Sequence, residues 1–301
     1  MRILLTGASG QVGGALLPLL RRRGHEVIAP GRADFDLARP ASLAAALEGW
    51  APGLIINPAA FTAVDQAEDD PATAFTVNAE APAALARWAA GRAVPLVHFS
   101  TDYVFDGSGE TPWREDDACR PLSVYGRSKR DGELAIQAAG APHLIVRTSW
   151  VYAAHGRNFL RTMMRLAAER PELRIVSDQV GAPTSAATLA AVLTAIVEGG
   201  AADLAAAFAA AGGVVHVANA GVTSWHGFAE AIVTGMRARG MDLAVQEIRA
   251  ISTAEFGAKA IRPLNSRLDL TRLRQVFGLT PPDWREALAA ELDRALDREE
   301  S

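Results

Sequence analysis

The sequence predicts an α/β protein in which a doubly wound, Rossmann-like parallel sheet is followed by a smaller C-terminal substrate-binding lobe. Short apolar runs alternate with longer helical patterns in the first half of the chain, which is typical of a parallel sheet covered by helices on both faces. A glycine-rich loop joins the first apolar run to the first helical pattern. The chain has 301 residues, half of them apolar, and can bury such a core without disulfides or metal ions.

Strands and helices can be assigned in order along the first half of the chain. Predicted strands, each short and apolar, cover residues 2–6, 26–29, 54–57, 94–100 and 144–148. Predicted helices cover residues 11–23, 42–48, 70–91, 123–139 and 158–168. Gly24 and Gly91 stand where two of these helices should end, since glycine favours helix termination. Pro18, inside the first helix, argues against a straight helix there.

The second half has a looser pattern, with predicted strands at residues 174–177, 214–217 and 245–248. Predicted helices cover residues 224–239 and 284–297, and the alanine-rich stretch 186–211 is interpreted as two helices with a break. We expect residues 1–150 to form a nucleotide-binding domain. We expect residues 151–301 to form mainly a substrate-binding lobe, with some segments returning to the first domain.

Composition excludes several classes of protein. A net charge of -4 argues against broad nucleic-acid binding, which usually shows a basic excess. The N-terminal apolar run is too short for a signal peptide, and no stretch has the length of a membrane helix, so we expect no membrane association. Cys119 is the only cysteine, which suits a reducing cytoplasm. The six histidines lack ligand spacing and the acidic run Asp65, Glu68, Asp69 and Asp70 resembles a solvated helix start, so no metal site is predicted.

The glycine-rich loop reads Gly7-Ala8-Ser9-Gly10-Gln11-Val12-Gly13 and lies between a predicted strand and a predicted helix. Glycine permits a tight turn and close approach of a pyrophosphate, and the helix N-terminus offers free N–H groups to phosphates. The alternative is an ordinary glycine-rich turn between a strand and a helix. Its position after the first strand favours nucleotide binding, with Gly7, Gly10, Gln11, Val12 and Gly13 as cofactor-binding residues.

The end of the second predicted strand bears on the choice of nucleotide. Enzymes that prefer NAD usually place an acidic residue there, whereas this chain has Arg32. A guanidinium can bind a 2′-phosphate bidentately, so Arg32 favours NADPH, with NADH as a poorer cofactor. A solvated surface arginine is the alternative.

Tyr125 and Lys129 are four residues apart on a predicted helix and should share one face of it. A nearby ammonium favours the phenolate form of tyrosine, so we expect Lys129 to lower the pKa of Tyr125. Ser100 and Thr101 stand at the carboxyl end of a predicted central strand, where α/β sheets bind ligands and where a hydroxyl can hydrogen-bond a reacting carbonyl. Each feature alone has a plain structural explanation, as a surface pair or as strand-end capping. Together with the glycine loop, and in this chain order, they make a strong joint signal.

The order of these motifs resembles the extended short-chain dehydrogenase/reductases. Within that superfamily, the chain is similar to the dTDP-4-dehydrorhamnose reductases over nearly its whole length. The similar segments are residues 57–65, 100–107, 147–152, 178–184 and 262–269. The resemblance implies NADPH-dependent reduction of the C4 ketone of dTDP-4-dehydro-L-rhamnose to dTDP-L-rhamnose, a nucleotide sugar used in polysaccharide biosynthesis.

The resemblance also implies roles for particular residues. Thr101, Tyr125 and Lys129 would be the catalytic trio, and Tyr125 and Lys129 would also contact the cofactor. Residues implied to line the cofactor are Ala59, Ala60 and Thr62. Residues implied to lie near the substrate are Asp102, Tyr103, Trp150, Asn265 and Ser266.

One departure from the family limits what is carried over. Some members have a carboxylate in the first helix that takes part in a metal-bridged dimer, but this chain has Ala15 there. We therefore predict neither that metal nor that dimer, and expect a monomer or another homodimer.

Two alternatives to this function stay open: an epimerase or 4,6-dehydratase with tightly bound NAD, and a non-catalytic NADP-binding regulatory subunit. A dehydratase would be expected to carry Asp-Glu after the strand-end threonine, where this chain has Asp102-Tyr103.

Overall fold

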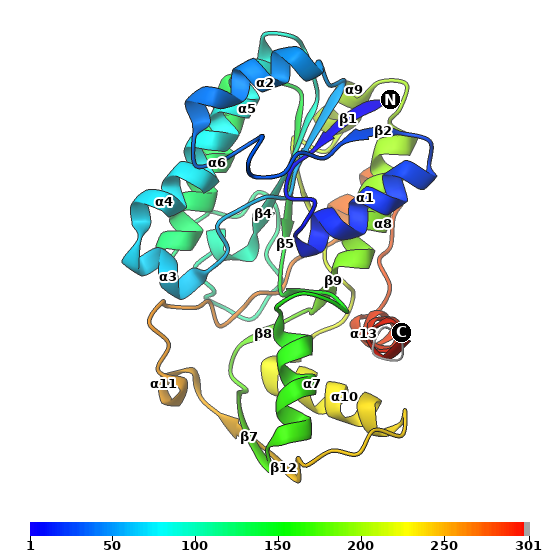
Figure 1. Ribbon diagram of the computed structural model, residues 1–301. Coiled ribbons are helices and arrows are strands. Elements are labelled where there is room, and N and C mark those ends of the chain that lie inside the picture. Colours follow the sequence, from blue (N-terminus) through cyan, green and yellow to red (C-terminus); the bar gives the residue numbers. More distant parts are fainter. Residues whose placement is uncertain (298–301) are drawn as a thin grey trace.

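A six-stranded parallel sheet, with strand order β10-β5-β4-β3-β1-β2, forms the centre of the protein (Figure 1). The computed structural model describes residues 1–297, so the last residues of the predicted 151–301 lobe lie outside it. The predicted α/β, doubly wound fold is confirmed. The strands of this sheet are β1 (Arg2–Leu5), β2 (Glu26–Ile28), β3 (Leu54–Asn57), β4 (Leu96–Thr101), β5 (His143–Thr148) and β10 (Val214–His216).

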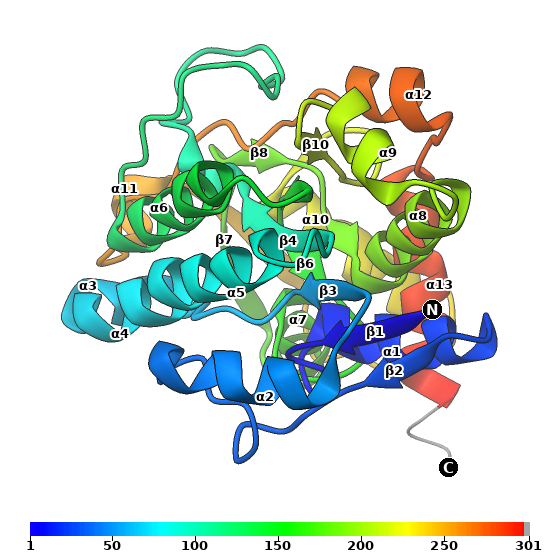
Figure 2. The same cartoon turned by 90° about the horizontal axis from the view of Figure 1, so that it is seen from above.

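Helices cover both faces of the sheet, as the unbroken apolar character of its strands requires (Figure 2). One face packs on α2 (Leu43–Trp50), α5 (Ala81–Ala90) and α6 (Val124–Ala139). The other packs on α1 (Gln11–Arg22), α8 (Ala186–Gly199), α9 (Leu204–Ala210) and α12 (Thr271–Phe277). Helix α1 continues through Pro18 to Arg22. The alanine-rich stretch is two helices with a break, as predicted.

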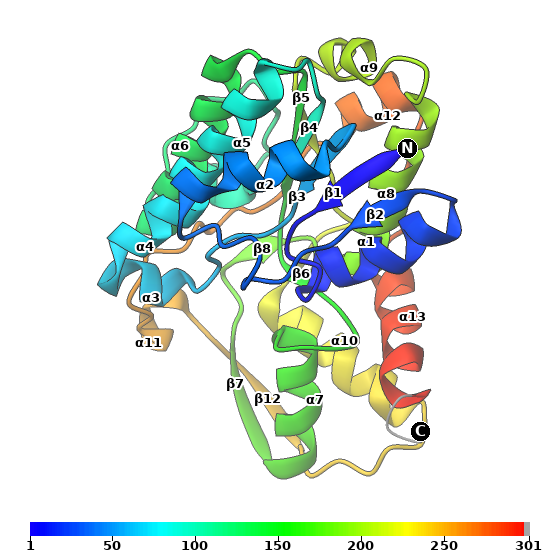
Figure 3. The same cartoon turned by 45° about the horizontal axis from the view of Figure 1, so that its top comes forward.

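The remaining elements gather beyond the carboxyl ends of the central strands (Figure 3). There β7 (Glu172–Val176) pairs in parallel with β12 (Glu247–Ile251). An apolar cluster around Phe228 and Trp284 joins this pair to three helices. They are α7 (Phe159–Glu169), α10 (Trp225–Arg237) and α13 (Trp284–Asp297). Short two-residue strands complete this part: β6 (Val151–Tyr152), β8 (Val180–Gly181), β9 (Thr184–Ser185) and β11 (Thr223–Ser224).

Two predicted elements differ most from those observed. The strand expected at residues 245–248 begins later, at Glu247, because its register with β7 starts there while Val245 N–H donates to the carbonyl of Ala167. The single helix expected at 70–91 is interrupted. It consists of α4 (Pro71–Phe75), a π-helical turn (Thr76–Glu80) and α5, and is preceded by α3 (Val64–Asp69). The C-terminal half of the chain contains a four-residue helix, α11 (Thr253–Phe256), which lies near α3 (Figure 1).

The π-helical turn brings the backbone against α6. Asn78 is fully buried there, and its amide donates to Ser128 Oγ at 3.0 Å and to the carbonyl of Phe61 at 3.0 Å. A Cβ on Gly132 would lie 2.1 Å from the carbonyl oxygen of Asn78, so this approach requires glycine. The contact fixes α6, and with it Tyr125 and Lys129, against the sheet.

No single helix within residues 1–297 is long and apolar enough to cross a membrane. Helices α8 and α9 pass that test only when taken together, and their axes are bent by 117°.

Candidate active site

A cleft of about 720 Å³ opens where the carboxyl ends of β1, β3, β4 and β5 meet the N-terminus of α1. This is the edge of a parallel sheet at which α/β proteins bind ligands. Of the residues predicted from the sequence, those that line the cleft are Gly7, Gly10, Gln11, Val12, Gly13, Arg32, Ala59, Ala60, Thr62, Thr101, Asp102, Tyr103, Tyr125, Lys129 and Trp150. Segments far apart in the chain therefore contribute to one hollow.

The glycine loop has the shape that a phosphate cradle needs. Gly7 has a φ of 57°, a left-handed conformation that glycine adopts without strain. A Cβ on Gly13 would lie 2.2 Å from the carbonyl oxygen of Gly7, so the helix can approach the loop only with glycine there. No side chain caps the N-terminus of α1, which leaves its first N–H groups available to an anion.

The residues of the cleft fit a dinucleotide cofactor. Gln11 Oε1 and Thr148 Oγ1 line the cleft and are buried without a hydrogen-bond partner among the described residues, which marks unused binding capacity. Arg32 is exposed at the cleft wall, where a 2′-phosphate could reach its guanidinium.

Tyr125 is held in the first turn of α6. The side chain of Ser123 caps this helix by accepting the N–H of Gly126 at 3.1 Å, and Glu68 Oε1 accepts the N–H of Val124 at 2.7 Å. A Cβ on Gly126 would lie 2.3 Å from the carbonyl oxygen of Tyr103, so glycine lets α6 pack tightly on the segment after β4. The rings of Tyr103 and Tyr125 meet edge to face, 5.5 Å apart.

Thr101 joins the end of β4 to Tyr125. Its hydroxyl donates to Asp102 Oδ1 at 3.0 Å and accepts the N–H of Tyr103 at 3.2 Å. Thr101 and Tyr125 line the same cleft, as expected for two groups that act on one oxygen atom.

Burial raises the pKa of the Tyr125 phenol above its ordinary value, and the Asp102 carboxylate adds to this effect. This corrects the expectation that Lys129 lowers the pKa of Tyr125. The physical reason is that the phenol is buried and the Lys129 ammonium bonds elsewhere. The raised pKa keeps the phenol protonated, which is the form that can donate a proton.

Lys129 is almost fully buried. Its Nζ lies 2.6 Å from the carbonyl oxygen of Phe99 and 3.1 Å from His98 Nε2. Burial lowers the pKa of Lys129 to about 8, against the opposing effect of Glu133. The Glu133 carboxylate is itself held by Arg147, through bonds of 2.8 Å from both Nε and a terminal nitrogen.

Asp102 lies at the cleft wall, and its carboxyl group is buried. Burial raises the pKa of this carboxyl to about 6. Its Oδ1 accepts the Thr101 hydroxyl at 3.0 Å, whereas Oδ2 is buried without a hydrogen-bond partner among the described residues. Ser266 is buried and does not line the cleft.

Asn265 also lies outside the cleft wall. Its side-chain nitrogen donates to the carbonyl of Thr111 at 2.8 Å, and its oxygen accepts from Arg267 Nε at 2.8 Å. Through these two hydrogen bonds, Asn265 holds the loop that carries Ser266.

Trp150 and Trp225 stack on one another at the cleft, with ring centroids 3.8 Å apart and planes 13° from parallel. Trp150 has a φ of 50°, a strained conformation for a large side chain and one that often marks a functional site. Trp225, which was not predicted as a site residue, also forms part of the wall. Other lining residues that were missed as site residues include Ser9, Pro58, Phe99, Thr148, His155, Arg157 and Asn158.

The acidic residues after β3 have structural roles, as the sequence analysis interpreted them. Asp65 forms a bidentate pair with Arg262 at 2.6 and 3.1 Å, and Asp69 pairs with Lys259. Asp70 caps α4. Within residues 1–297, no group of three or more His, Cys, Asp or Glu side chains could hold a metal ion.

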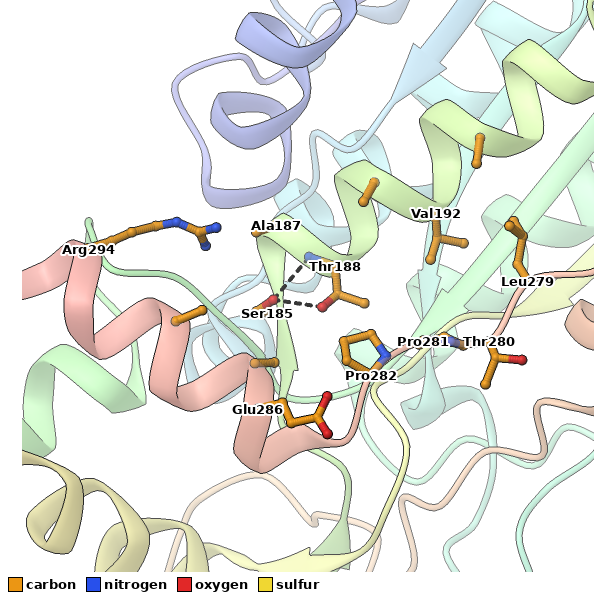
Figure 4. A pocket seen from close by; sticks show the side chains of 14 residues that line it. Ser185, Ala187, Thr188, Val192, Leu279, Thr280, Pro281, Pro282, Glu286 and Arg294 are labelled. Atoms are coloured by element: carbon orange, nitrogen blue, oxygen red, sulfur yellow. Dashed lines mark hydrogen bonds between the residues drawn. The ribbon is translucent and has the colours of Figure 1, made fainter.

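A second hollow lies between α8 and α13 and has a volume of about 420 Å³ (Figure 4). Alanine, valine, leucine and proline side chains form most of its wall. Its Ser185 hydroxyl caps α8 by accepting the N–H of Thr188 at 3.0 Å. The hollow lacks the histidine, lysine and tyrosine side chains that acid–base chemistry uses, so the cleft at the sheet edge is the candidate active site.

Known proteins resemble this chain along its whole length. A family model described as "RmlD substrate binding domain" matches residues 1–296. A dTDP-4-dehydrorhamnose reductase from Burkholderia thailandensis is 47% identical over 96% of this chain and 97% of its own, and one from Escherichia coli K12 is 41% identical over 94% of each. The crystal structure of a dTDP-4-dehydrorhamnose reductase from Bacillus anthracis, in complex with NADP, has a TM-score of 0.88 and 33% identity, covering 97% of this chain and 99% of that one. The chain belongs to the dTDP-4-dehydrorhamnose reductase family.

Proposed function

We propose that this protein is an NADPH-dependent oxidoreductase that reduces the C4 ketone of dTDP-4-dehydro-L-rhamnose to give dTDP-L-rhamnose. The observation that carries the proposal is the convergence of Thr101, Tyr125 and Lys129 with the glycine loop on one cleft. Relatives at 41 and 47% identity over nearly the full length are reductases of this kind, which supports the same substrate class here.

NADPH supplies the hydride for the carbonyl carbon. The glycine loop and Arg32 bind the phosphates, and Ala59, Ala60 and Thr62 form the wall beside them. Thr101 holds the carbonyl oxygen by a hydrogen bond, and the Tyr125 phenol donates its proton to that oxygen as negative charge develops on it. Lys129 binds ribose hydroxyls of the cofactor as an ammonium.

Substrate contacts come from the far side of the cleft. Asp102, Tyr103 and Trp150 are proposed to face the nucleotide sugar, with Asn265 and Ser266 holding that side in place. Residues 1–150 are proposed to bind mainly the cofactor and residues 151–301 mainly the substrate. We further propose a cytoplasmic location, which the solitary Cys119 suits, and a monomer or homodimer, which sedimentation equilibrium distinguishes.

The test is NADPH consumption with a panel of nucleotide-linked 4-keto sugars. We expect turnover with dTDP-4-dehydro-L-rhamnose and formation of dTDP-L-rhamnose. An epimerase or dehydratase would retain nicotinamide absorbance after purification and consume no NADPH, and a regulatory subunit would bind NADP without turnover. Either result would overturn the proposal.

A further inference from the structure

A line of buried polar side chains crosses the sheet and ends at Lys129. Thr6 Oγ1 lies 2.6 Å from Asn57 Oδ1, Asn57 Nδ2 lies 3.0 Å from His98 Nδ1, and His98 Nε2 lies 3.1 Å from Lys129 Nζ. These four residues follow β1 or belong to β3, β4 and α6, and none is more than 2% exposed. A buried line of this kind is costly unless every member is satisfied.

For one protonation state of the line, the distances identify the donor of each hydrogen bond. A separation of 2.6 Å is typical of O–H···O and short for N–H···O, so Thr6 donates to the oxygen of Asn57. The Asn57 amide nitrogen then donates to His98 Nδ1. Burial holds the pKa of His98 well below its ordinary value, so the ring is neutral, and in this state it carries its proton on Nε2. In this state His98 donates to Lys129, which must accept as a neutral amine.

A charged Lys129 requires the opposite order. An ammonium has three donors and no acceptor, so His98 must present a lone pair at Nε2 and carry its proton on Nδ1. That proton needs an acceptor, which the Asn57 amide supplies by turning its oxygen toward the ring. Thr6 then accepts from the amide nitrogen. The charge of Lys129 and the direction of the whole line are therefore linked.

Few charged groups act on the charge of Lys129 or on the tautomer of His98. Lys129 is the charge that acts on His98, and Glu133, one turn along α6, is the charge that acts on Lys129. Glu133 is engaged by Arg147 of β5 and by Arg130, at 2.7 Å. Asn57 of β3 is neutral, and the remaining partner of Lys129 is a backbone carbonyl of β4.

We propose that His98 is a positioning residue for Lys129, and that the line Thr6–Asn57–His98 couples the charge of Lys129 to the tautomer of His98. The proposal rests on the proposed function, in which Lys129 binds cofactor ribose as an ammonium. Its consequence is that β1 and β3, which carry no acid–base group of the reaction, help to set the pH range over which the cofactor binds.

Replacing Asn57 by aspartate tests the coupling with almost no change of shape. A carboxylate can only accept, so in Asn57→Asp it accepts from both Thr6 and His98 Nδ1, which leaves Nε2 as an acceptor for the ammonium. NADPH affinity, followed by nucleotide fluorescence as a function of pH, should fall at higher pH than in the parent protein. His98→Phe removes the acceptor and should weaken NADPH roughly tenfold, the scale of one buried hydrogen bond, with the fall moved to lower pH.

Three further variants separate coupling from other causes. His98→Gln keeps a polar atom near the Nε2 position and should restore most of the affinity lost in His98→Phe. His216→Phe removes another fully buried ring from the same sheet and should leave the pH profile unchanged. The double variant Asn57→Asp/His98→Phe keeps the new charge but breaks the line, so it should lack the shift to higher pH.

The result that overturns the inference is a shift that persists in the double variant, which would make it a through-space charge effect. An Asn57→Asp profile identical to that of the parent would overturn it equally. If His98→Phe does not fold, loss of the shift in Asn57→Asp/His98→Gln would overturn the inference, because glutamine can still bridge the aspartate and the ammonium. Failure of the proposed function would look different: the parent would bind NADPH with the same profile but reduce no ketone.

Discussion

Tyr125 and Asp102 line the same cleft, and burial raises the pKa of both, because it penalises the charged form of each group. For Tyr125 the consequence is a phenol that stays protonated and ready to donate. For Asp102, with a pKa of about 6, it is a carboxyl that changes charge within an accessible pH range. The two groups therefore differ in what pH does to them, although one physical cause acts on both.

Removing the phenolic oxygen tests the proton donor. Tyr125→Phe should lower kcat by roughly 10²–10⁴-fold, the usual range for general acid catalysis, while NADPH still binds. Thr101→Val, which keeps the shape and loses the hydroxyl, should cost less, and Lys129→Ala should weaken cofactor binding as well. The measurement is kcat beside NADPH affinity by fluorescence. Near-normal kcat in Tyr125→Phe would place the donor elsewhere.

Arg32 carries the cofactor preference. Arg32→Ala should weaken NADPH binding and leave NADH nearly unaffected, because only NADPH has the 2′-phosphate that the guanidinium binds. Dissociation constants for both cofactors check this, with NADH as the internal control. Equal losses for the two, or no loss for either, would make Arg32 an ordinary surface residue.

The raised pKa of Asp102 predicts a pH-dependent effect on stability. Between its unfolded value near 4 and its folded value of about 6, the folded protein binds more protons, so this group's contribution to stability falls as pH rises through that window. Asp102→Asn cannot ionise and should therefore gain stability relative to the parent from about pH 4 to pH 6. Urea unfolding of both proteins across that range gives the difference. A difference that does not vary with pH would contradict the burial argument.

Among the elements, α6 was predicted well and the C-terminal loops were not. The spacing of Tyr125 and Lys129 places them on one helix face, and both side chains line the cleft. Ser266 was linked to the substrate by family resemblance, but its position depends on a loop that Asn265 ties to the carbonyl of Thr111. Local spacing cannot show such a contact, because it forms only when the chain closes on itself.

The loop that holds Ser266 depends on Asn265. Asn265→Ala would leave the carbonyl of Thr111 and the N–H of Arg267 without the partner that the buried Asn265 side chain supplies, which should lower the free energy of unfolding by about 1–3 kcal/mol. Because the loop that carries Ser266 would lose its position, KM for the nucleotide sugar should rise while NADPH affinity is kept. Urea unfolding and KM measured on the same preparation check both parts. Unchanged stability with a raised KM would instead indicate direct contact with substrate.

At the scale of the whole molecule, the first half of the chain could be predicted from its own pattern, because each apolar strand and each helix is local. The contacts that join the two halves of the chain could not be predicted in the same way. Strand β10 enters the sheet beside β5, and α8 packs on α1, although long segments separate them in sequence. The interrupted helix before β4 was missed because the π-helical turn is set by its approach to Gly132 of α6, a tertiary contact.

The most direct test of the central claim follows the hydride through the whole enzyme. The protein is incubated with dTDP-4-dehydro-L-rhamnose and NADPH that carries deuterium at C4 of the nicotinamide, on the face that the enzyme uses, and the product is examined by mass spectrometry and NMR. We predict dTDP-L-rhamnose with one deuterium at sugar C4 for each NADPH oxidised. A product without deuterium, formed with no net oxidation of NADPH, would show that hydride is recycled on a retained cofactor and would contradict it.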